Sequence, residues 1–141
     1  MGYLAQNSNG RHVLIDELAS AGKIPKKYLE VILLTLRKGG LLTSRIGRGG
    51  GYRLSHDPSA ITIGNIVRIL EGDFTLVHCL KGNGTAQCED GNNPLCCGIH
   101  LVMLDVKKKI TSVFEATTLA DIINKSEAAN KSKAKGKSQG D

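Results

Sequence analysis

The chain has 141 residues, with 19 Lys and Arg against 13 Asp and Glu, a net charge of +6 and 40% hydrophobic residues. This length suits one domain, or one small domain with an arm, and excludes a large two-domain enzyme. An aromatic content of 4% without tryptophan argues against a platform that stacks nucleic-acid bases. Residues 1–11 are polar, unlike a signal peptide, and the apolar stretch Val31–Leu34 is too short to span a membrane. We therefore expect a cytoplasmic protein without membrane contacts.

The positive charge is unevenly distributed along the chain. Met1–Asp57 carries a net charge of +5, Pro58–Asn130 a net charge of −2, and Lys131–Asp141 a net charge of +3. A basic front half is typical of proteins that bind an acidic partner, most plausibly nucleic acid. The alternative, a surface that is basic only for solubility, has to be weighed against the motifs.

Two short helices and a tight turn are predicted at the front of the chain. The first helix covers Val13–Ala21, with Leu14, Leu18 and Ala19 on one face. Gly22 and Lys23 form the turn, and Pro25 suits the first position of a second helix that runs to about Lys38. Apolar residues recur there at helical spacing, and Gly39–Gly40 ends the helix. This pattern predicts a helix-turn-helix.

A β-hairpin is predicted next, from the extended runs Leu41–Thr43 and Tyr52–Leu54 and the Gly- and Arg-rich segment between them. A hairpin directly after a recognition helix is the wing of a winged helix-turn-helix domain. Thr62 is expected to cap a further helix that runs through Leu70 and ends at Gly72. The predicted fold class is therefore mainly α, with a small β-hairpin wing.

The second half of the chain combines a loop with a long helix. Residues 74–94 lack periodicity and are rich in Gly and Asn, which predicts a loop. A long helix follows Pro94 and runs to about Ala116, and its narrow apolar stripe favours helix–helix dimerisation. That stripe contains Ile99, Val102, Met103, Val106, Ile110, Val113 and Phe114. Thr117 or Thr118 is expected to cap a last short helix, Leu119–Ile123, and residues 131–141 are expected to be disordered.

The start of the second helix carries candidate DNA contacts. A helix N-terminus favours phosphate, and Lys26 and Lys27 strengthen that preference. Tyr28 is expected either to contact the DNA backbone or to pack in the core against the first helix. Glu30 is expected either to accept a hydrogen bond from cytosine or to lie on a solvated face.

The wing carries a second set of candidate contacts. Arg45 and Arg48 suit a narrow minor groove, and Gly49 and Gly50 allow the backbone to approach a duplex closely. A phosphate-binding loop for a nucleotide is disfavoured, because no GK[ST] sequence follows.

The cysteines form a separate cluster. Cys79, Cys88 and Cys97 have eight residues between successive members, and Cys97-x-x-His100 adds an imidazole one helical turn later. Three cysteines and one histidine suit zinc or an iron–sulfur cluster, and spacing alone does not separate the two metals. Thiols without a cofactor are the third interpretation.

The segment KKYLEVILLTLRKGGLLTSRIGRGGGYRLS (Lys26–Ser55) resembles the signature of the IscR/NsrR/CymR-type (Rrf-two) winged-helix transcription factors. ITIGNIVRILEG (Ile61–Gly72) and TTLADII (Thr117–Ile123) resemble later segments of the same family. This resemblance implies a homodimer on double-stranded DNA, at a pseudo-palindromic operator. Each recognition helix would lie in a major groove and each wing along the adjacent minor groove.

The resemblance also implies an iron–sulfur cluster, of two or four irons, in the cysteine region. The family's ligand pattern is matched by Cys79, Cys88, Cys97 and His100, with Cys96 as an alternative to Cys97. The gaps between successive cysteines are longer here than in the best-known members. The sequence departs from the family's pattern at two further places. Met1–Gln6 represents only part of the family's long first helix, and Lys23 stands where the family has its turn glycine.

Together these features predict a DNA-binding transcriptional regulator, a repressor rather than an enzyme, that senses redox, nitric oxide or iron–sulfur status. The expected organisation is a DNA-binding domain (1–72), a sensor loop (73–97), dimerisation and closing helices (98–125) and a basic tail (126–141). The alternatives are a cluster-free regulator controlled by a metabolite or a partner protein, and a zinc-stabilised interaction module. No Ser/His/Asp or paired-carboxylate motif supports catalysis.

Overall fold

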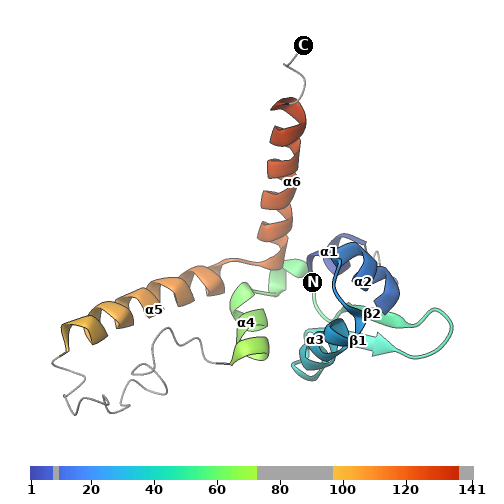
Figure 1. Ribbon diagram of the computed structural model, residues 1–141, viewed down its shortest axis with the longest axis horizontal. Coiled ribbons are helices and arrows are strands. Elements are labelled where there is room, and N and C mark those ends of the chain that lie inside the picture. Colours follow the sequence, from blue (N-terminus) through green and yellow to red (C-terminus); the bar gives the residue numbers. More distant parts are fainter. Residues whose placement is uncertain (8–9, 73–96, 137–141) are drawn as a thin grey trace.

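The computed structural model describes residues 1–7, 10–72 and 97–136, and the side chains of these residues up to Asn130. The described chain is mainly helical, with one antiparallel hairpin of two strands, as the sequence predicted (Figure 1). The elements in chain order are α1 (Gly2–Asn7), α2 (Ile15–Gly22), α3 (Lys26–Lys38), β1 (Leu42–Arg45), β2 (Gly51–Leu54), the 3-10 turn η1 (Pro58–Ala60), α4 (Ile63–Glu71), α5 (Gly98–Ala116) and α6 (Leu119–Gly136).

Helices α2 and α3 form the predicted helix-turn-helix. Leu29, Leu33 and Leu36 are buried on one face of α3, as their helical spacing predicted. Pro25 precedes the first helical residue as the N-cap, one position before its predicted place. Lys23 adopts a left-handed conformation with φ of 51° and caps α2, so it occupies a position that favours glycine.

The prediction for the first helix was wrong at its start. Val13 is extended rather than helical, and it exchanges two backbone hydrogen bonds of 2.8 Å with Tyr52 of β2. Leu14 precedes the helix and is exposed, so it does not share a buried face with Leu18. The local pattern hid this arrangement, because the strand that pairs with Val13 lies far along the chain.

The hairpin packs beside α3. Leu42 pairs with Leu54, and Arg45 pairs with Gly51, so a five-residue loop, 46–50, forms the tip of the wing. The core lies between α1, α2, α3, the hairpin and the start of α6. Its buried members are Leu4, Val13, Leu18, Leu29, Leu33, Leu36, Leu41, Leu42, Ile61 and Leu119. The short α1 therefore contributes to the core through Leu4.

A polar network joins α1 and α2 at the edge of this core. The guanidinium of Arg11 donates to both carboxylate oxygens of Glu17, at 3.1 and 2.7 Å, and the Tyr3 hydroxyl donates to Glu17 Oε1 at 2.9 Å. The hydrogen bond from Arg11, and after it the one from Tyr3, lowers the pKa of Glu17. The same bond to Glu17 raises the pKa of Tyr3. The network fixes α2 relative to α1.

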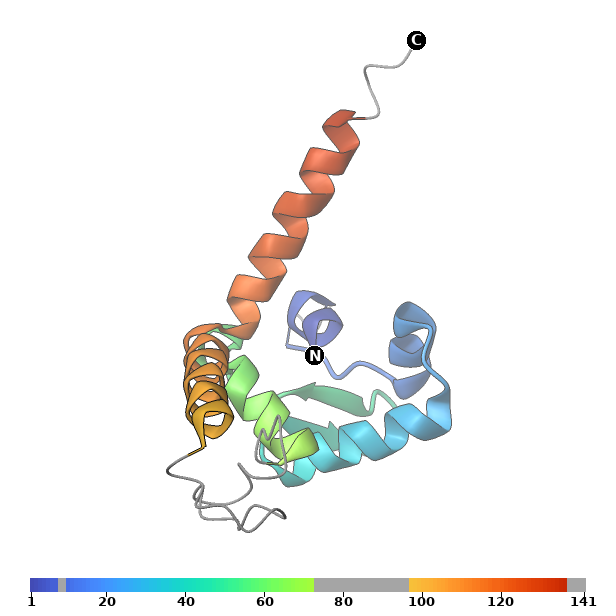
Figure 2. The same cartoon turned by 60° about the vertical axis from the view of Figure 1, so that its left-hand side comes forward.

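Helix α4 connects the winged helix-turn-helix to α5. Its N-cap is Thr62, as predicted, and the Thr62 hydroxyl accepts from the Asn65 backbone N–H at 3.1 Å. One side of α4 packs on the end of α3, and the other contacts α5 through Gly64 and the Arg68–Glu115 ion pair of 2.8 Å. Figure 2 shows α4 lying between α3 and α5.

Helix α5 ends at Ala116, as predicted, but α6 is much longer than expected. It extends from Leu119 to Gly136, into the segment that was predicted to be a disordered tail. The stretch between Ile123 and Gly136 contains neither Pro nor Gly and is rich in Ala and Lys, which sustain a helix. Gln6 of α1 also donates to Glu127 of α6 at 3.5 Å. Both long helices project from the body (Figure 1).

No helix in the described ranges is long and apolar enough to cross a membrane. The predicted sensor loop, apart from Cys97, lies outside the described residues.

Candidate nucleic-acid interface and metal centre

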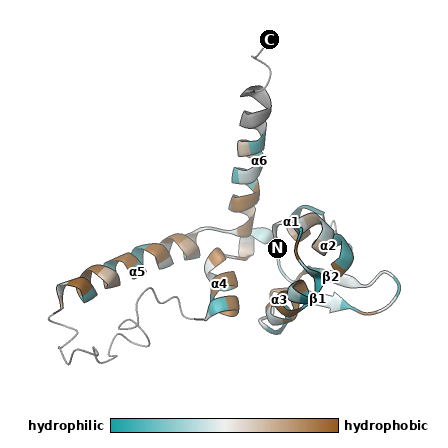
Figure 3. Cartoon of the chain, viewed as in Figure 1, coloured by the Kyte–Doolittle hydropathy of each residue, from teal (hydrophilic) through white to brown (hydrophobic). Residues whose placement is uncertain are grey.

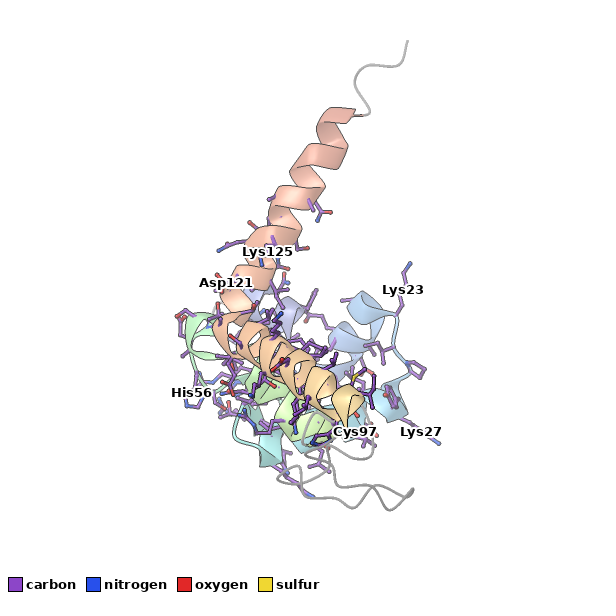
Figure 4. All side chains as sticks on the ribbon, turned by 90° about the vertical axis from the view of Figure 1, so that its left-hand side faces the viewer. Lys23, Lys27, His56, Cys97, Asp121 and Lys125 are labelled. Atoms are coloured by element: carbon purple, nitrogen blue, oxygen red, sulfur yellow. The ribbon has the colours of Figure 1, made fainter. Side chains whose placement is uncertain are left out.

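Helix α3 exposes one side of its first two turns. Tyr28 is 65% exposed, so the interpretation in which it packs in the core against the first helix is wrong. Lys27 and Glu30 are also exposed, which leaves both side chains accessible to a partner. In Figure 4 the side chains of Lys23 and Lys27 extend outward from the region where α2 meets α3.

Lys26 differs from Lys27 because its ammonium is already paired. Its Nζ atom lies 2.7 Å from Asp16 Oδ1 of α2, and this contact raises the pKa of Lys26. The side chains of Lys26 and Asp16 are both largely exposed, and an exposed ion pair of this kind contributes little to stability. Lys26 therefore has a neutralising partner that would compete with a phosphate.

The wing presents arginines on a tight glycine turn. Arg45 and Arg48 are exposed, and Ile46 between them is 97% exposed. Gly49 has a positive φ of 77°, and Gly50 is buried with its N–H donating to Gly47 O at 2.8 Å. A Cβ atom on Gly50 would collide with the carbonyl of Arg45. Gly50 is thus required by the turn itself, and its contact with DNA stays a prediction.

Two further arginines, Arg53 and Arg37, lie beside these candidates and were missed in the sequence. Arg53 is exposed on β2, and its Nε donates to Thr43 Oγ1 across the hairpin at 3.3 Å. Arg37 of α3 donates to Ser44 Oγ of β1 at 2.9 Å, which ties the recognition helix to the wing. The alternation of Tyr52, Arg53 and Leu54 carried the signal for Arg53, because neighbouring strand residues face opposite sides.

The candidate metal ligands are only partly described. Cys97 is a free, partly exposed cysteine at the N-cap of α5, and His100 follows one turn later. His100 is 2% exposed, and neither ring nitrogen has a hydrogen-bond partner among the described residues. Cys79, Cys88 and Cys96 lie outside the described residues, and within the described ranges no group of three potential ligands comes together.

A buried imidazole without a partner is unusual, because the cost of removing it from water is not recovered. A metal ion bound through one ring nitrogen would satisfy that atom, and the neighbouring Cys97 supplies a thiol of the kind that iron and zinc prefer. The described part of the proposed ligand set therefore fits a metal centre at the start of α5.

Comparisons with known proteins give consistent similarities. A family profile described as an iron-dependent transcriptional regulator, Rrf2, matches residues 1–125. The rrf2-like HTH-type transcriptional regulator of Rhodobacter capsulatus is 32% identical over 119 residues, which cover 84% of this chain and 79% of that protein. The HTH-type transcriptional regulator IscR of Yersinia pseudotuberculosis is 31% identical, covering 86% of this chain and 70% of that protein.

Solved structures show the same architecture. The structure of T. potens IscR matches with a TM-score of 0.70 and 30% identity, covering 91% of this chain and 80% of that chain. The structure of CymR, the global cysteine regulator of B. subtilis, matches with a TM-score of 0.69 and 28% identity. The match covers 87% of this chain and 86% of that chain. These matches confirm the winged helix fold that the sequence predicted.

Proposed function

The chain belongs to the Rrf2 family of transcriptional regulators, and from this premise we propose that it is a homodimeric repressor of double-stranded operator DNA. In each protomer α3 enters the major groove of one half-site, and the wing follows the adjacent minor groove. Its relatives are named as transcriptional regulators rather than enzymes.

The observation that carries DNA binding is the exposure of basic side chains on both α3 and the wing. Lys27 on α3 and Arg45, Arg48 and Arg53 on the hairpin are all exposed, and the Arg37–Ser44 hydrogen bond joins the two elements. Phosphate groups bind such a basic surface by electrostatic attraction, and the glycine turn brings its arginines to the tip of the wing.

The wing assignment is tested with Arg48→Ala. We expect operator affinity to fall about tenfold, because one minor-groove or phosphate contact is lost, and the salt dependence of binding to become shallower. Lys125→Ala is the matched control, since it removes the same charge from α6, away from Lys27 in Figure 4. Affinity of the Arg48 variant equal to that of the Lys125 variant at every salt concentration would refute the assignment.

The proposed dimer uses α5. Ile99, Val102 and Val113 of the predicted stripe are exposed on this projecting helix, and Figure 3 shows hydrophobic residues along its length. An apolar stripe of this spacing on an isolated helix suits a second copy of the same helix. Two protomers joined there would present two α3 helices to a two-fold operator.

We also propose that this protein is regulated by an iron–sulfur cluster held by Cys79, Cys88, Cys97 and His100. Support comes from the family description, which names iron, and from the buried His100 imidazole without a described partner next to Cys97. A bound cluster would supply reactivity towards oxidants and nitric oxide and sensitivity to iron supply. Cys97 and His100 begin the dimerisation helix, so ligand binding there would bear directly on the position of α5.

The cluster proposal is tested by anaerobic purification followed by visible absorption and by iron and sulfide analysis. We expect a coloured protein with stoichiometric iron and sulfide, and loss of colour and iron in Cys97→Ser. The Cys96→Ser variant is the control, and it should keep its iron if Cys97 is the third ligand. A colourless protein with stoichiometric zinc would contradict the cluster and support the zinc alternative.

A further inference from the structure

Helix α3 has an outer ridge of four residues, Lys27, Val31, Leu34 and Lys38, which follow one another at helical spacing. The ridge lies on the side opposite the buried Leu29, Leu33 and Leu36. All four ridge residues are exposed, with Val31 at 62% and Leu34 at 39%. The centre of the helix face that should be most polar is therefore apolar, with one lysine at each end.

This apolar centre does not serve the fold. Val31 and Leu34 are neighbours on the helix surface, and their exposure leaves them outside the core of the described protein. The Thr35 hydroxyl beside them donates to the Val31 carbonyl at 2.9 Å, so its proton is used within the helix. The middle of the ridge thus offers methyl groups to a partner, rather than hydrogen-bond donors.

We propose that Val31 and Leu34 recognise thymine 5-methyl groups in the major groove. This inference rests on the proposed DNA-binding function and names the bases that its recognition helix selects. The thymine methyl is the apolar group that the major groove presents, and aliphatic side chains are its natural contacts. Packing of Val31 or Leu34 on such a methyl removes apolar surface of both partners from water.

The lysines at the two ends identify the partner as a duplex. Lys27 and Lys38 are eleven residues apart, which corresponds to about 16 Å along a helix axis. The major groove is about 12 Å wide, so the two ammonium groups can reach phosphates on its two sides while the ridge faces the bases. A second copy of α3 is a poor partner, because a two-fold contact would bring Lys27 of one copy against Lys38 of the other.

The test begins with selection of binding sites for the whole protein from random duplex DNA. Each thymine of the selected site is then replaced by deoxyuridine, which removes the methyl group and keeps the hydrogen-bonding pattern. At one or two positions per half-site, we expect this change to weaken binding about fourfold. This is the affinity that burial of one methyl carbon contributes. Val31→Ala or Leu34→Ala should abolish that effect at its own position.

Lys27→Ala is the matched control, because it should weaken binding to thymine and uracil sites equally. Thermal unfolding of each variant should match the parent, since the replaced side chains are exposed. Equal binding of thymine and uracil throughout the site, or an undiminished uracil effect in both Val31→Ala and Leu34→Ala, would overturn this inference while leaving DNA binding intact. Failure to select any sequence would overturn the proposed function itself.

Discussion

Gly39 shows how one residue sets the position of α3 relative to α4. It ends α3 at the point where α4 crosses, and a Cβ atom there would lie 2.6 Å from Cδ1 of Ile69. Ile69 is packed against the core, so it has little room to move away. The absence of a side chain at residue 39 therefore allows α3 and α4 to approach each other.

Replacing Gly39 with alanine should destabilise the protein by about 1–3 kcal/mol, because the added methyl group overpacks this contact. Urea unfolding followed by circular dichroism measures the change. Gly2→Ala is the control, since a Cβ atom at that helical position meets nothing within 4 Å. Equal stability of the two variants would show that α3 and α4 can separate at no cost.

Lys23 is a second residue whose backbone conformation matters more than its side chain. Its φ of 51° is unfavourable for any residue with a Cβ atom, and glycine removes that strain. Lys23→Gly should therefore stabilise the protein by about 0.5–1 kcal/mol, after the greater freedom of glycine in the unfolded chain is subtracted. The melting temperature should rise, whereas it should fall in the control Lys27→Gly, which places glycine inside α3. A fall in both variants would contradict the strain at Lys23.

At the scale of elements, the start of α6 depends on a reciprocal cap. The Thr118 hydroxyl accepts from the Asp121 N–H at 3.2 Å, and Asp121 Oδ2 accepts from the Thr118 backbone N–H at 2.9 Å and from its hydroxyl at 2.7 Å. These bonds favour the charged carboxylate, so the pKa of Asp121 lies below its usual value.

A carboxyl group with a lower pKa in the folded state stabilises the fold above its unfolded pKa. That contribution disappears as the pH falls through the folded pKa, which places the window below about pH 4. Asp121→Asn should therefore be less stable than the parent at pH 7, and the difference should shrink in acid. Melting temperatures from pH 7 to pH 3 test this, with Asp105→Asn, at an exposed site on α5, as the control. A difference that persists unchanged at pH 3 would contradict it.

The elements that the sequence predicted well carry their own local signals. The buried leucines of α3 and the Thr62 cap of α4 follow from spacing and residue type. Val13 could not be placed, because its extended conformation depends on hydrogen bonds to Tyr52. The length of α6 was underestimated, since its weakly apolar sequence resembles a solvated tail although no Pro or Gly precedes Gly136 in it.

In the candidate site, too, local features could be predicted from the sequence, whereas features that depend on packing could not. Basic residues at a helix start and on a glycine-rich wing were visible in the sequence, but the ion pair between Lys26 and Asp16 required the packing of α2 against α3. The burial of His100 was equally hidden, because its neighbours in sequence are exposed. The ligand role of Cys79 and Cys88 stays a prediction.

At the scale of the whole molecule, the proposed function assigns different tasks to the two halves. Exposed basic residues lie on α3 and the hairpin. Helix α5 projects from the body (Figure 1), and several of its apolar side chains are exposed. Operator binding by the proposed dimer would require both halves, because the dimer would fix the spacing between its two α3 helices. Loss of the dimer should therefore weaken DNA binding without any change in α3 or the wing.

Val102→Glu tests this dependence. Val102 is 55% exposed, so a charge there is tolerated by the protomer but would be buried against a second α5. We expect a folded monomer in analytical ultracentrifugation and a loss of operator affinity of at least about a hundredfold, because the two half-sites no longer bind as a linked pair. Lys108→Glu introduces a charge change on the opposite side of α5 and should stay dimeric. A dimeric Val102→Glu protein with parental affinity would show that the protomers join elsewhere.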